Sequence, residues 1–96
     1  NIENPEEAFQ KIKKNIKELW REEKIVHGDL SEYNVLMTEE GEVWIDFSQG
    51  VHKSHPEAVE LLKRDVENMA SFFSRQGADI DEQEAVEQVL EALEDL

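Results

Sequence analysis

The strongest constraint on the fold comes from residues 54–77, where apolar side chains cover two adjacent stripes of a helix. The first stripe is formed by Val59, Leu62, Val66, Met69, Ala70 and Phe73. The second stripe is formed by Ala58, Leu61 and Phe72, and it also includes Asp65. A helix that is apolar over so wide an arc must be covered on more than one side, so we expect it to be central and buried. The carboxylate of Asp65 falls inside this arc and therefore needs hydrogen-bond partners.

Short local signals mark the two ends of this helix. Ser54 and Glu57 predict an S-x-x-E capping box, with Pro56 in the first turn. Gly77 predicts the C-terminal end, because glycine readily adopts the left-handed conformation that ends many helices.

Two further helices are predicted, one on each side of the central one along the chain. The first begins at Asn4 and Pro5, where Glu7 completes an N-x-x-E box. Its apolar face is formed by Phe9, Ile12, Ile16, Leu19 and Trp20, and its solvated face by Lys11, Lys13, Lys14 and Lys17. The last helix begins near Asp81, with Glu84 three residues on and a Glu-rich outer face that we expect to be solvated. Its inner face is formed by Val86, Val89, Leu90 and Leu93.

Residues 25–45 read as a short β section. Residues 25–27 are a strand candidate, and residues 28–34 form a polar loop. Residues 35–37 and 43–45 are apolar, β-prone arms around a five-residue segment that contains Gly41, which predicts a hairpin. If Val35 pairs with Ile45, then Leu36 pairs with Trp44 and Met37 with Val43. The predicted fold is therefore of the α+β class.

Composition narrows the range of functions. The chain has 96 residues, with 10 Lys and Arg against 24 Asp and Glu and a net charge of −14. Such an acidic chain is poorly suited to nucleic-acid backbones or anionic lipid. The absence of Cys excludes disulfides, thiolate zinc sites and thiol catalysis. No apolar run approaches the roughly 20 residues of a membrane span. We expect one soluble, cytoplasmic domain, and the Asn at position 1 suggests a piece of a longer protein.

The chemistry-bearing pattern is H-x-D-x-x-x-x-N, formed by His27, Asp29 and Asn34, with Asp46 twelve residues further on. The hairpin register above places Asn34 opposite Asp46, with Cβ atoms about 5 Å apart. An amide oxygen and a carboxylate with room for water and phosphate suit Mg²⁺. Asp29, at the start of the loop, could accept the proton of an attacking hydroxyl. The alternative is an ordinary turn, since Asp and Asn are common in loops and a one-residue register slip would separate the pair.

With these residues in view, the chain resembles the RIO family of atypical protein serine kinases. Residues 25–36, which read IVHGDLSEYNVL, resemble the catalytic loop of that family. The metal segment of the family is similar to residues 45–49, and its later landmarks to His55-Pro56, Arg64-Asp65-Val66 and Phe72-Phe73. Ser48-Gln49 and His55-Pro56 are closer to the type 1 branch than to type 2.

The resemblance implies a protein-kinase-like C-terminal lobe over residues 1–96, with helices packed around the hairpin that carries the catalytic and metal-binding loops. It implies transfer of the γ-phosphoryl group of ATP. Asp29 would be the proton acceptor, and Asn34 and Asp46 would bind Mg²⁺, or Mn²⁺, with the nucleotide. Asp46 would also accept phosphate as an aspartyl phosphate. His27 would pack behind the loop, and Asp65 would support it by accepting backbone N–H groups.

The resemblance also implies partners and limits. Its members are associated with maturation of the small ribosomal subunit, so the pre-ribosomal particle is an expected partner. Gly28 replaces the Arg of H-R-D, and eight residues separate Asp46 from His55, too few for a peptide-docking activation segment. No phosphate-covering loop or strand Lys is recognisable. We therefore expect the N-terminal lobe to be absent, the fragment to be inactive alone, and an exposed apolar patch to allow self-association.

Three other interpretations remain. A small-molecule kinase of the aminoglycoside or choline type shares H-G-D-L…N and I-D-F, although Ser31-Glu32-Tyr33 and His55-Pro56 favour the RIO family. A non-catalytic interaction module could retain the same fold. His52 and His55 could form a metal pair, but no Cys or obvious third ligand accompanies them.

Overall fold

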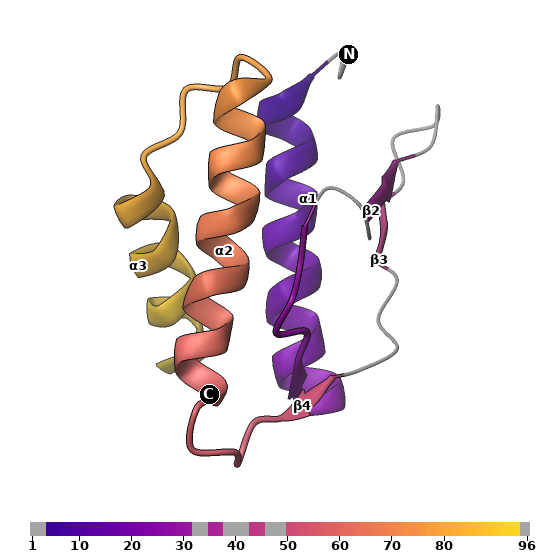
Figure 1. Ribbon diagram of the computed structural model, residues 1–96, viewed down its shortest axis with the longest axis vertical. Coiled ribbons are helices and arrows are strands. Elements are labelled where there is room, and N and C mark those ends of the chain that lie inside the picture. The colour runs from indigo at the N-terminus through magenta and orange to yellow at the C-terminus, as the bar shows by residue number, and fades with distance from the viewer. Residues whose placement is uncertain (1–3, 32–34, 38–42, 46–49, 95–96) are drawn as a thin grey trace.

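The central element of the computed structural model is α2, which contacts α1 on one side and α3 on the other (Figure 1). The structure describes residues 4–31, 35–37, 43–45 and 50–94. Its elements in chain order are α1 (Pro5–Glu18), the π-helical turn η1 (Leu19–Glu23), β1 (Ile25–Val26), β2 (Val35–Met37), β3 (Val43–Ile45), β4 (Val51–His52), α2 (Ala58–Arg75) and α3 (Glu82–Glu94). The described part is mostly helical with small antiparallel sheets, which agrees with the predicted α+β class.

The core lies among the three helices. The α2 side chains that are at most 1% exposed are Ala58, Leu62, Asp65, Val66, Met69, Ala70 and Phe73. From α1, the Phe9 ring approaches the Phe73 ring with centroids 5.9 Å apart. From α3, Val86 and Val89 are buried in the same cluster. The predicted central position of this helix is confirmed.

Val59 departs from the predicted apolar stripe. It lies in the first turn of α2 and is 43% exposed. Among the side chains that the structure describes, it is the large hydrophobic one that remains exposed. The apolar patch expected for self-association stays a prediction.

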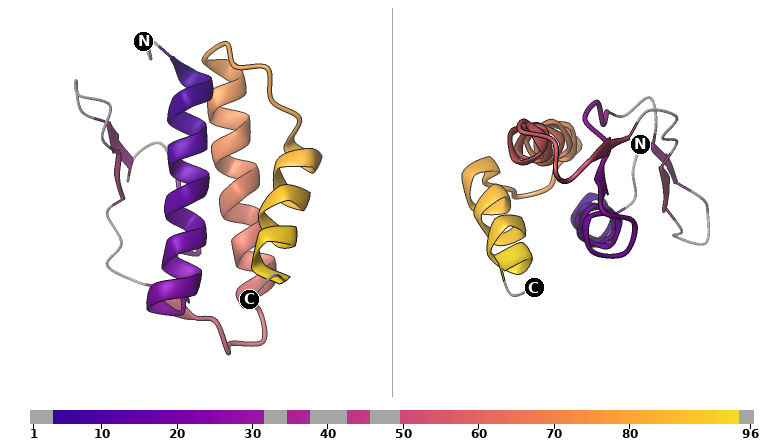
Figure 2. Two further views of the ribbon diagram at one scale, coloured as in Figure 1. Left: turned by 180° about the vertical axis from the view of Figure 1, so that it is seen from behind. Right: turned by 90° about the horizontal axis from the view of Figure 1, so that it is seen from below.

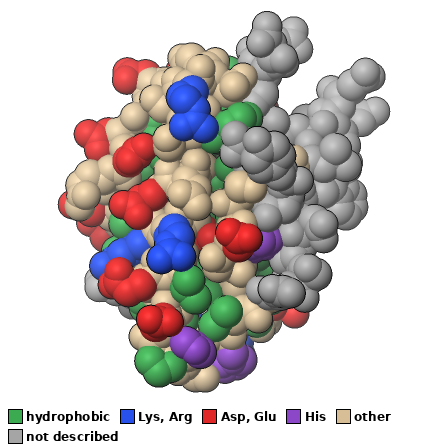
Figure 3. All heavy atoms as spheres, viewed as in Figure 1, with side chains coloured by type: hydrophobic (Ala, Val, Ile, Leu, Met, Phe, Trp, Pro, Cys, Tyr) green, Lys and Arg blue, Asp and Glu red, His purple; other side chains and the backbone are tan. Residues whose placement is uncertain are grey.

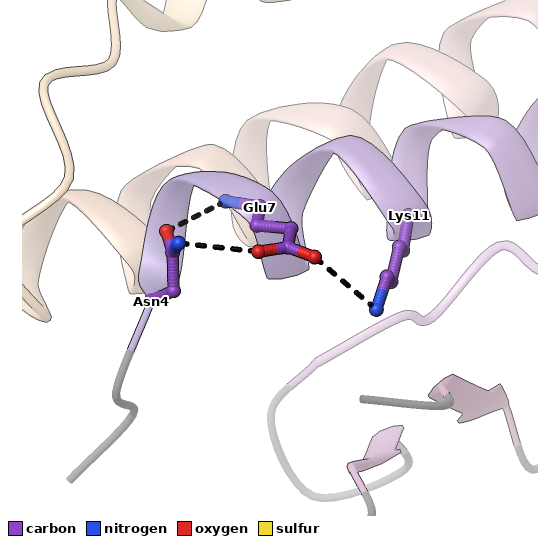
Figure 4. Close-up of polar contacts among 3 residues, drawn as sticks. All are labelled: Asn4, Glu7 and Lys11. Atoms are coloured by element: carbon purple, nitrogen blue, oxygen red, sulfur yellow. Dashed lines mark hydrogen bonds and ion pairs between the residues drawn. The ribbon is translucent and has the colours of Figure 1, made fainter. Parts of the chain in front are cut away.

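The start of α1 follows the sequence signal (Figure 4). The Asn4 Oδ1 accepts a hydrogen bond from the backbone N–H of Glu7 at 3.2 Å, which confirms the predicted cap. The Glu7 carboxylate accepts from the Asn4 side-chain amide at 3.2 Å, rather than from its backbone N–H as in a standard capping box. It also lies 3.6 Å from the Lys11 ammonium. The side chains of this first turn thus satisfy one another locally.

The predicted capping box at the start of α2 is wrong. The helix begins at Ala58, and Pro56 lies in the turn before it. The backbone N–H of Ser54 donates to His52 Nδ1 at 3.1 Å, and that of Glu57 donates to His55 Nδ1 at 3.1 Å. Imidazole nitrogens therefore take the acceptor role that the sequence pattern assigned to hydroxyl and carboxylate oxygens.

The end of α2 and the start of α3 agree with their predictions. Gly77 follows the C-cap residue Gln76 and has φ of +104°. The N–H of Ala78 donates to the Phe73 carbonyl, and that of Gly77 to the Ser74 carbonyl, which is the Schellman arrangement. Asp81 Oδ1 then accepts from the backbone N–H of Glu84 at 3.0 Å and caps α3.

The outer face of α3 is solvated as predicted. Its exposed acidic side chains are Glu82, Glu84, Glu87 and Glu91. Figure 3 shows acidic groups spread over the α2 and α3 side of the molecule, interspersed with basic ones.

Among the described residues, every helix is too short or too polar to span a membrane.

The prediction that Lys13 lies on the solvated face of α1 is wrong, because its side chain is buried. Its side chain is 6% exposed and its ammonium donates to Gln88 Oε1 of α3 at 3.0 Å. The same ammonium lies 5.0 Å from the centroid of the Phe9 ring. Burial, together with the nearby charge of Lys17, lowers the pKa of Lys13, while Glu84 opposes that shift. An amide and a ring face thus solvate this charge where α3 covers α1.

The strands form two antiparallel pairs. In the first, Val35 pairs with Ile45, Leu36 with Trp44 and Met37 with Val43, so the predicted hairpin register is confirmed. In the second, β1 pairs with β4, a strand that the sequence pattern did not reveal. The predicted strand over residues 25–27 ends at Val26.

The position of the hairpin differs from the prediction of helices packed around it. Strands β2 and β3 lie beside α1, on the side away from α3, in both views of the ribbon (Figure 1, Figure 2). The three-residue arms are too short to form a centre. The wide apolar arc of α2 takes that place instead.

A matched pair of valines on α2 tests this core. Val66→Ala should lower the free energy of unfolding by about 2 kcal/mol, because two buried methyl groups are lost and a cavity remains. Val59→Ala should change it by less than about 0.5 kcal/mol, because the side chain is exposed and Ala favours helix. Urea unfolding of both variants measures the difference. Equal losses would show that Val59 is covered in solution.

Candidate functional site

The site is built on the loop that follows β1, and α2 holds this loop through Asp65. Asp65 is 1% exposed. Its Oδ2 accepts from the backbone N–H of Gly28 at 2.8 Å, and its Oδ1 accepts from that of Leu30 at 3.0 Å. Both carboxylate oxygens are therefore used on backbone groups about 35 residues away in sequence. These are the hydrogen bonds that a carboxylate at this buried position was expected to need.

His27 binds the backbone N–H of Asp29, which lies between those of Gly28 and Leu30. Its side chain is 9% exposed, and its Nδ1 accepts from the backbone N–H of Asp29 at 3.1 Å. Nδ1 must be unprotonated to accept this bond. The three consecutive N–H groups of residues 28–30 thus all donate to acceptors of the protein itself, while the Asp29 side chain is exposed.

Leu30 is the buried end of the loop. Its side chain is 0% exposed, and its carbonyl oxygen accepts from the Asn68 side-chain amide of α2 at 3.3 Å. At the other end, Gly28 has φ of +89°, a conformation that glycine adopts without strain. A Cβ there would meet Leu61 and Val51 only at 3.8 and 3.9 Å, so the backbone angle rather than crowding favours glycine.

The electrostatics of Asp65 reflect two opposing effects. Burial raises the pKa of Asp65, and the nearby charge of Asp29 adds to this rise. The N–H groups of Leu30 and Gly28, and the electrostatic interaction with the His27 ring, act in the opposite direction and lower this pKa. The pKa is raised overall because desolvation is the largest effect.

The two predicted metal ligands, Asn34 and Asp46, lie outside the described residues. The described ladder ends at the Val35–Ile45 pair, which is adjacent in sequence to both of them. Within residues 4–31, 35–37, 43–45 and 50–94, no group of three His or acidic side chains could hold a metal ion. His52 and His55, considered as a metal pair, each accept a backbone N–H at Nδ1.

The sequence patterns missed two contacts of this loop. The bond from the Asp29 N–H to His27 and the bond from Asn68 to Leu30 were not predicted. The available signal for Asn68 was its spacing, because residues three apart on a helix share a face and Asp65 had already been assigned to the loop.

Comparison with known proteins identifies the class. Residues 1–86 match the family model of the RIO domain. The chain therefore belongs to the RIO domain family. Relatives in this family are named serine/threonine-protein kinases, which implies ATP and a divalent metal as the general kind of cofactor.

Individual relatives agree with this assignment. The RIO-type serine/threonine-protein kinase Rio1 of Haloferax volcanii is 46% identical over 80 residues, which cover 83% of this chain and 27% of the relative. Its namesake in Methanocaldococcus jannaschii is 49% identical over 74 residues, covering 77% and 26%. The human serine/threonine-protein kinase RIO3 is 42% identical over 78 residues, covering 80% and 15%. The chain thus spans about a quarter or less of the length of these relatives.

Removing one acceptor of Asp65 should destabilise the fold. Asp65→Asn keeps the size of the side chain but turns an amide donor toward one of the two loop N–H groups. The free energy of unfolding at pH 7 should fall by about 1–3 kcal/mol, the typical cost of an unsatisfied buried donor. Glu67→Gln, an exposed change two residues away on α2, should stay within about 0.5 kcal/mol of the parent. Equal unfolding midpoints in urea would contradict the bonding seen here.

The raised pKa of Asp65 predicts how this effect changes with pH. When a folded-state pKa lies above the unfolded one, the stability it contributes is fully present below the unfolded pKa and is lost as pH rises through the folded pKa. The stability advantage of the parent over Asp65→Asn should therefore narrow as pH rises above about 4. Unfolding curves of both proteins across this range measure the gap. A gap that widens with pH would show that the two N–H bonds outweigh burial.

Proposed function

We propose that this chain is the C-terminal catalytic lobe of a RIO-type serine/threonine kinase and ATPase, of the type 1 branch. One observation carries the proposal: the exposed Asp29 carboxylate lies on a loop whose three consecutive N–H groups are bound by Asp65 and His27. Because those N–H groups are already used, residues 28–30 do not hold phosphate through their backbone. The loop offers a carboxylate instead, which suits acceptance of a proton from a hydroxyl nucleophile.

The reaction follows from that assignment. Asp29 orients the attacking hydroxyl and accepts its proton as the oxygen bonds to the γ-phosphorus of ATP. The bond from that phosphorus to the β–γ bridging oxygen breaks, and ADP leaves. Asp65, His27 and the buried Leu30 keep the loop in place, so little reorganisation accompanies the proton transfer.

We assign Asn34 and Asp46 to the divalent metal, Mg²⁺ or Mn²⁺, that accompanies ATP. Their amide and carboxylate oxygens are the ligand types that Mg²⁺ prefers. The Val35–Ile45 pairing supports this assignment, because the same register, if it continued by one residue on each strand, would pair Asn34 with Asp46. When bound, the metal neutralises phosphate charge. We also propose that in the ATPase reaction a carboxylate oxygen of Asp46 bonds to the γ-phosphorus as its bond to the β–γ bridging oxygen breaks, so that ADP leaves and an aspartyl phosphate forms, which water then hydrolyses to phosphate.

The role of the whole protein is the broadest part of the proposal. The family resemblance supports a cytoplasmic protein that acts on the maturing small ribosomal subunit. Because the curated relatives are about four times longer or more, the remaining contacts to ATP would come from residues beyond these 96. The similarity to named protein kinases favours a protein substrate over a small molecule.

Variants of the full-length protein separate the proposed roles. Asp29→Asn should lower phosphoryl transfer by about 10²–10⁴-fold, because the proton acceptor is lost, while Mg·ATP affinity stays unchanged. Asp46→Asn should weaken metal-dependent ATP affinity and remove a hydroxylamine-labile phosphorylated form. Asn34→Ala should weaken ATP affinity less, because an amide oxygen binds a divalent cation less strongly than a carboxylate. Calorimetry with Mg²⁺ and a phosphotransfer assay measure these effects.

Glu67→Gln on the exposed face of α2 is the matched control and should leave both measurements unchanged. Equal ATP affinity in all three site variants would show that the metal ligands are assigned wrongly. Full phosphoryl transfer by Asp29→Asn would show the same for the proton acceptor.

A further inference from the structure

We propose that Asn68 is a positioning residue for the Asp29 loop, acting with Asp65 as a two-residue clamp on Leu30. This inference rests on the proposed function of Asp29. The two clamp residues are three apart on α2 and therefore share one face of the helix. Asp65 Oδ1 accepts the Leu30 N–H at 3.0 Å, and the Asn68 amide donates to the Leu30 carbonyl oxygen at 3.3 Å.

The chemistry of each clamp residue matches the backbone group it binds. An ionised carboxylate can only accept, so Asp65 suits N–H groups and cannot bind the carbonyl. An amide can donate, so Asn68 supplies what Asp65 lacks. The residue type is also informative, because Asn is a poor choice for an exposed position in the middle of an 18-residue helix unless its side chain is used.

The clamp fixes two successive peptide planes. The Leu30 N–H belongs to the peptide that joins Asp29 to Leu30, and the Leu30 carbonyl belongs to the peptide that joins Leu30 to Ser31. The Leu30 side chain is 0% exposed and cannot rotate freely. With Asp65 alone, the second plane would still be able to turn. Asn68 therefore restrains the peptide plane that follows Leu30 and, together with Asp65, limits movement of the loop segment that carries Asp29.

Hydrogen exchange of the 96-residue chain tests the clamp without any assay of activity. Asn68→Asp and Asn68→Leu both remove the donor, one with added charge and one without. Each should speed exchange of the backbone N–H groups of residues 29–31 by about three- to tenfold, the effect of losing one neutral hydrogen bond. Amides of the α2 core, such as those of Met69 and Ala70, should be unchanged. Asn68→Gln, which keeps the donor, should restore most of the protection.

Two results would overturn the clamp. One is unchanged exchange at residues 29–31 in both donor-less variants. The other is an equal rise at residues 29–31 and in the α2 core, because that pattern reports general destabilisation.

Kinetics of the full-length protein separate the clamp from the proposed function. Asn68→Asp and Asn68→Leu should lower kcat for phosphoryl transfer and leave the KM for Mg·ATP unchanged, with Asn68→Gln close to the parent. If the exchange pattern is as expected but the parent transfers no phosphoryl group, the proposed function fails and the clamp on Leu30 stands. If the parent is active and kcat is unaffected by both donor-less variants, Asn68 does not position Asp29.

Discussion

The structure depends on one buried carboxylate. Asp65 lies in the middle of the central helix, among the side chains that this helix buries in the core, and burial raises its pKa. The helix tolerates it because two backbone N–H groups, of Gly28 and Leu30, donate to its two oxygens. The loop gains in turn, since its N–H groups have no partners in a sheet or helix of their own. The carboxylate and the loop N–H groups thus satisfy each other's hydrogen bonding, and the loop is held in place by a residue of the helical core.

A second buried charged group, the ammonium of Lys13, also has a polar partner, at the interface between α1 and α3. The Lys13 ammonium lies where α3 covers α1, and it is bound by the Gln88 amide and faces the Phe9 ring. Neither partner carries a charge, so the pair avoids the cost of burying two ions. A polar contact between residues far apart in sequence thus joins α2 to the loop after β1, and another joins α1 to α3. These contacts add to apolar burial in holding each pair of elements together.

Local signals in the sequence predicted what depends on neighbouring residues. The Asn4 and Asp81 caps, the Gly77 end of α2 and the register of the hairpin all involve groups close in sequence, and all agree with the structure. Two of the failures depend on tertiary contacts. Lys13 is buried because of α3, and β4 exists because it pairs with β1. At the start of α2, two histidines replaced the expected cap, because an imidazole accepts an N–H as well as an oxygen does.

For the site, the sequence indicated a buried carboxylate at Asp65 that needs hydrogen-bond partners, but it did not indicate the full set of hydrogen bonds within the loop. The spacing of His27, Asp29 and Asn34 singled out this loop and the apolar arc singled out Asp65, but neither showed that the N–H groups of residues 28–30 all donate to acceptors within the protein. These internal hydrogen bonds bear on how ATP could bind under the proposed function. Within the described part of the loop, the N–H groups of residues 28–30 are already bound and are not offered to ATP, and the chain carries a net charge of −14. A triphosphate would be repelled by such a lobe unless a divalent cation and basic groups from elsewhere in the protein offset its charge. Under the proposed function, this acidic part of the protein would supply proton acceptance and metal binding, and phosphate recognition would fall to other parts of the protein.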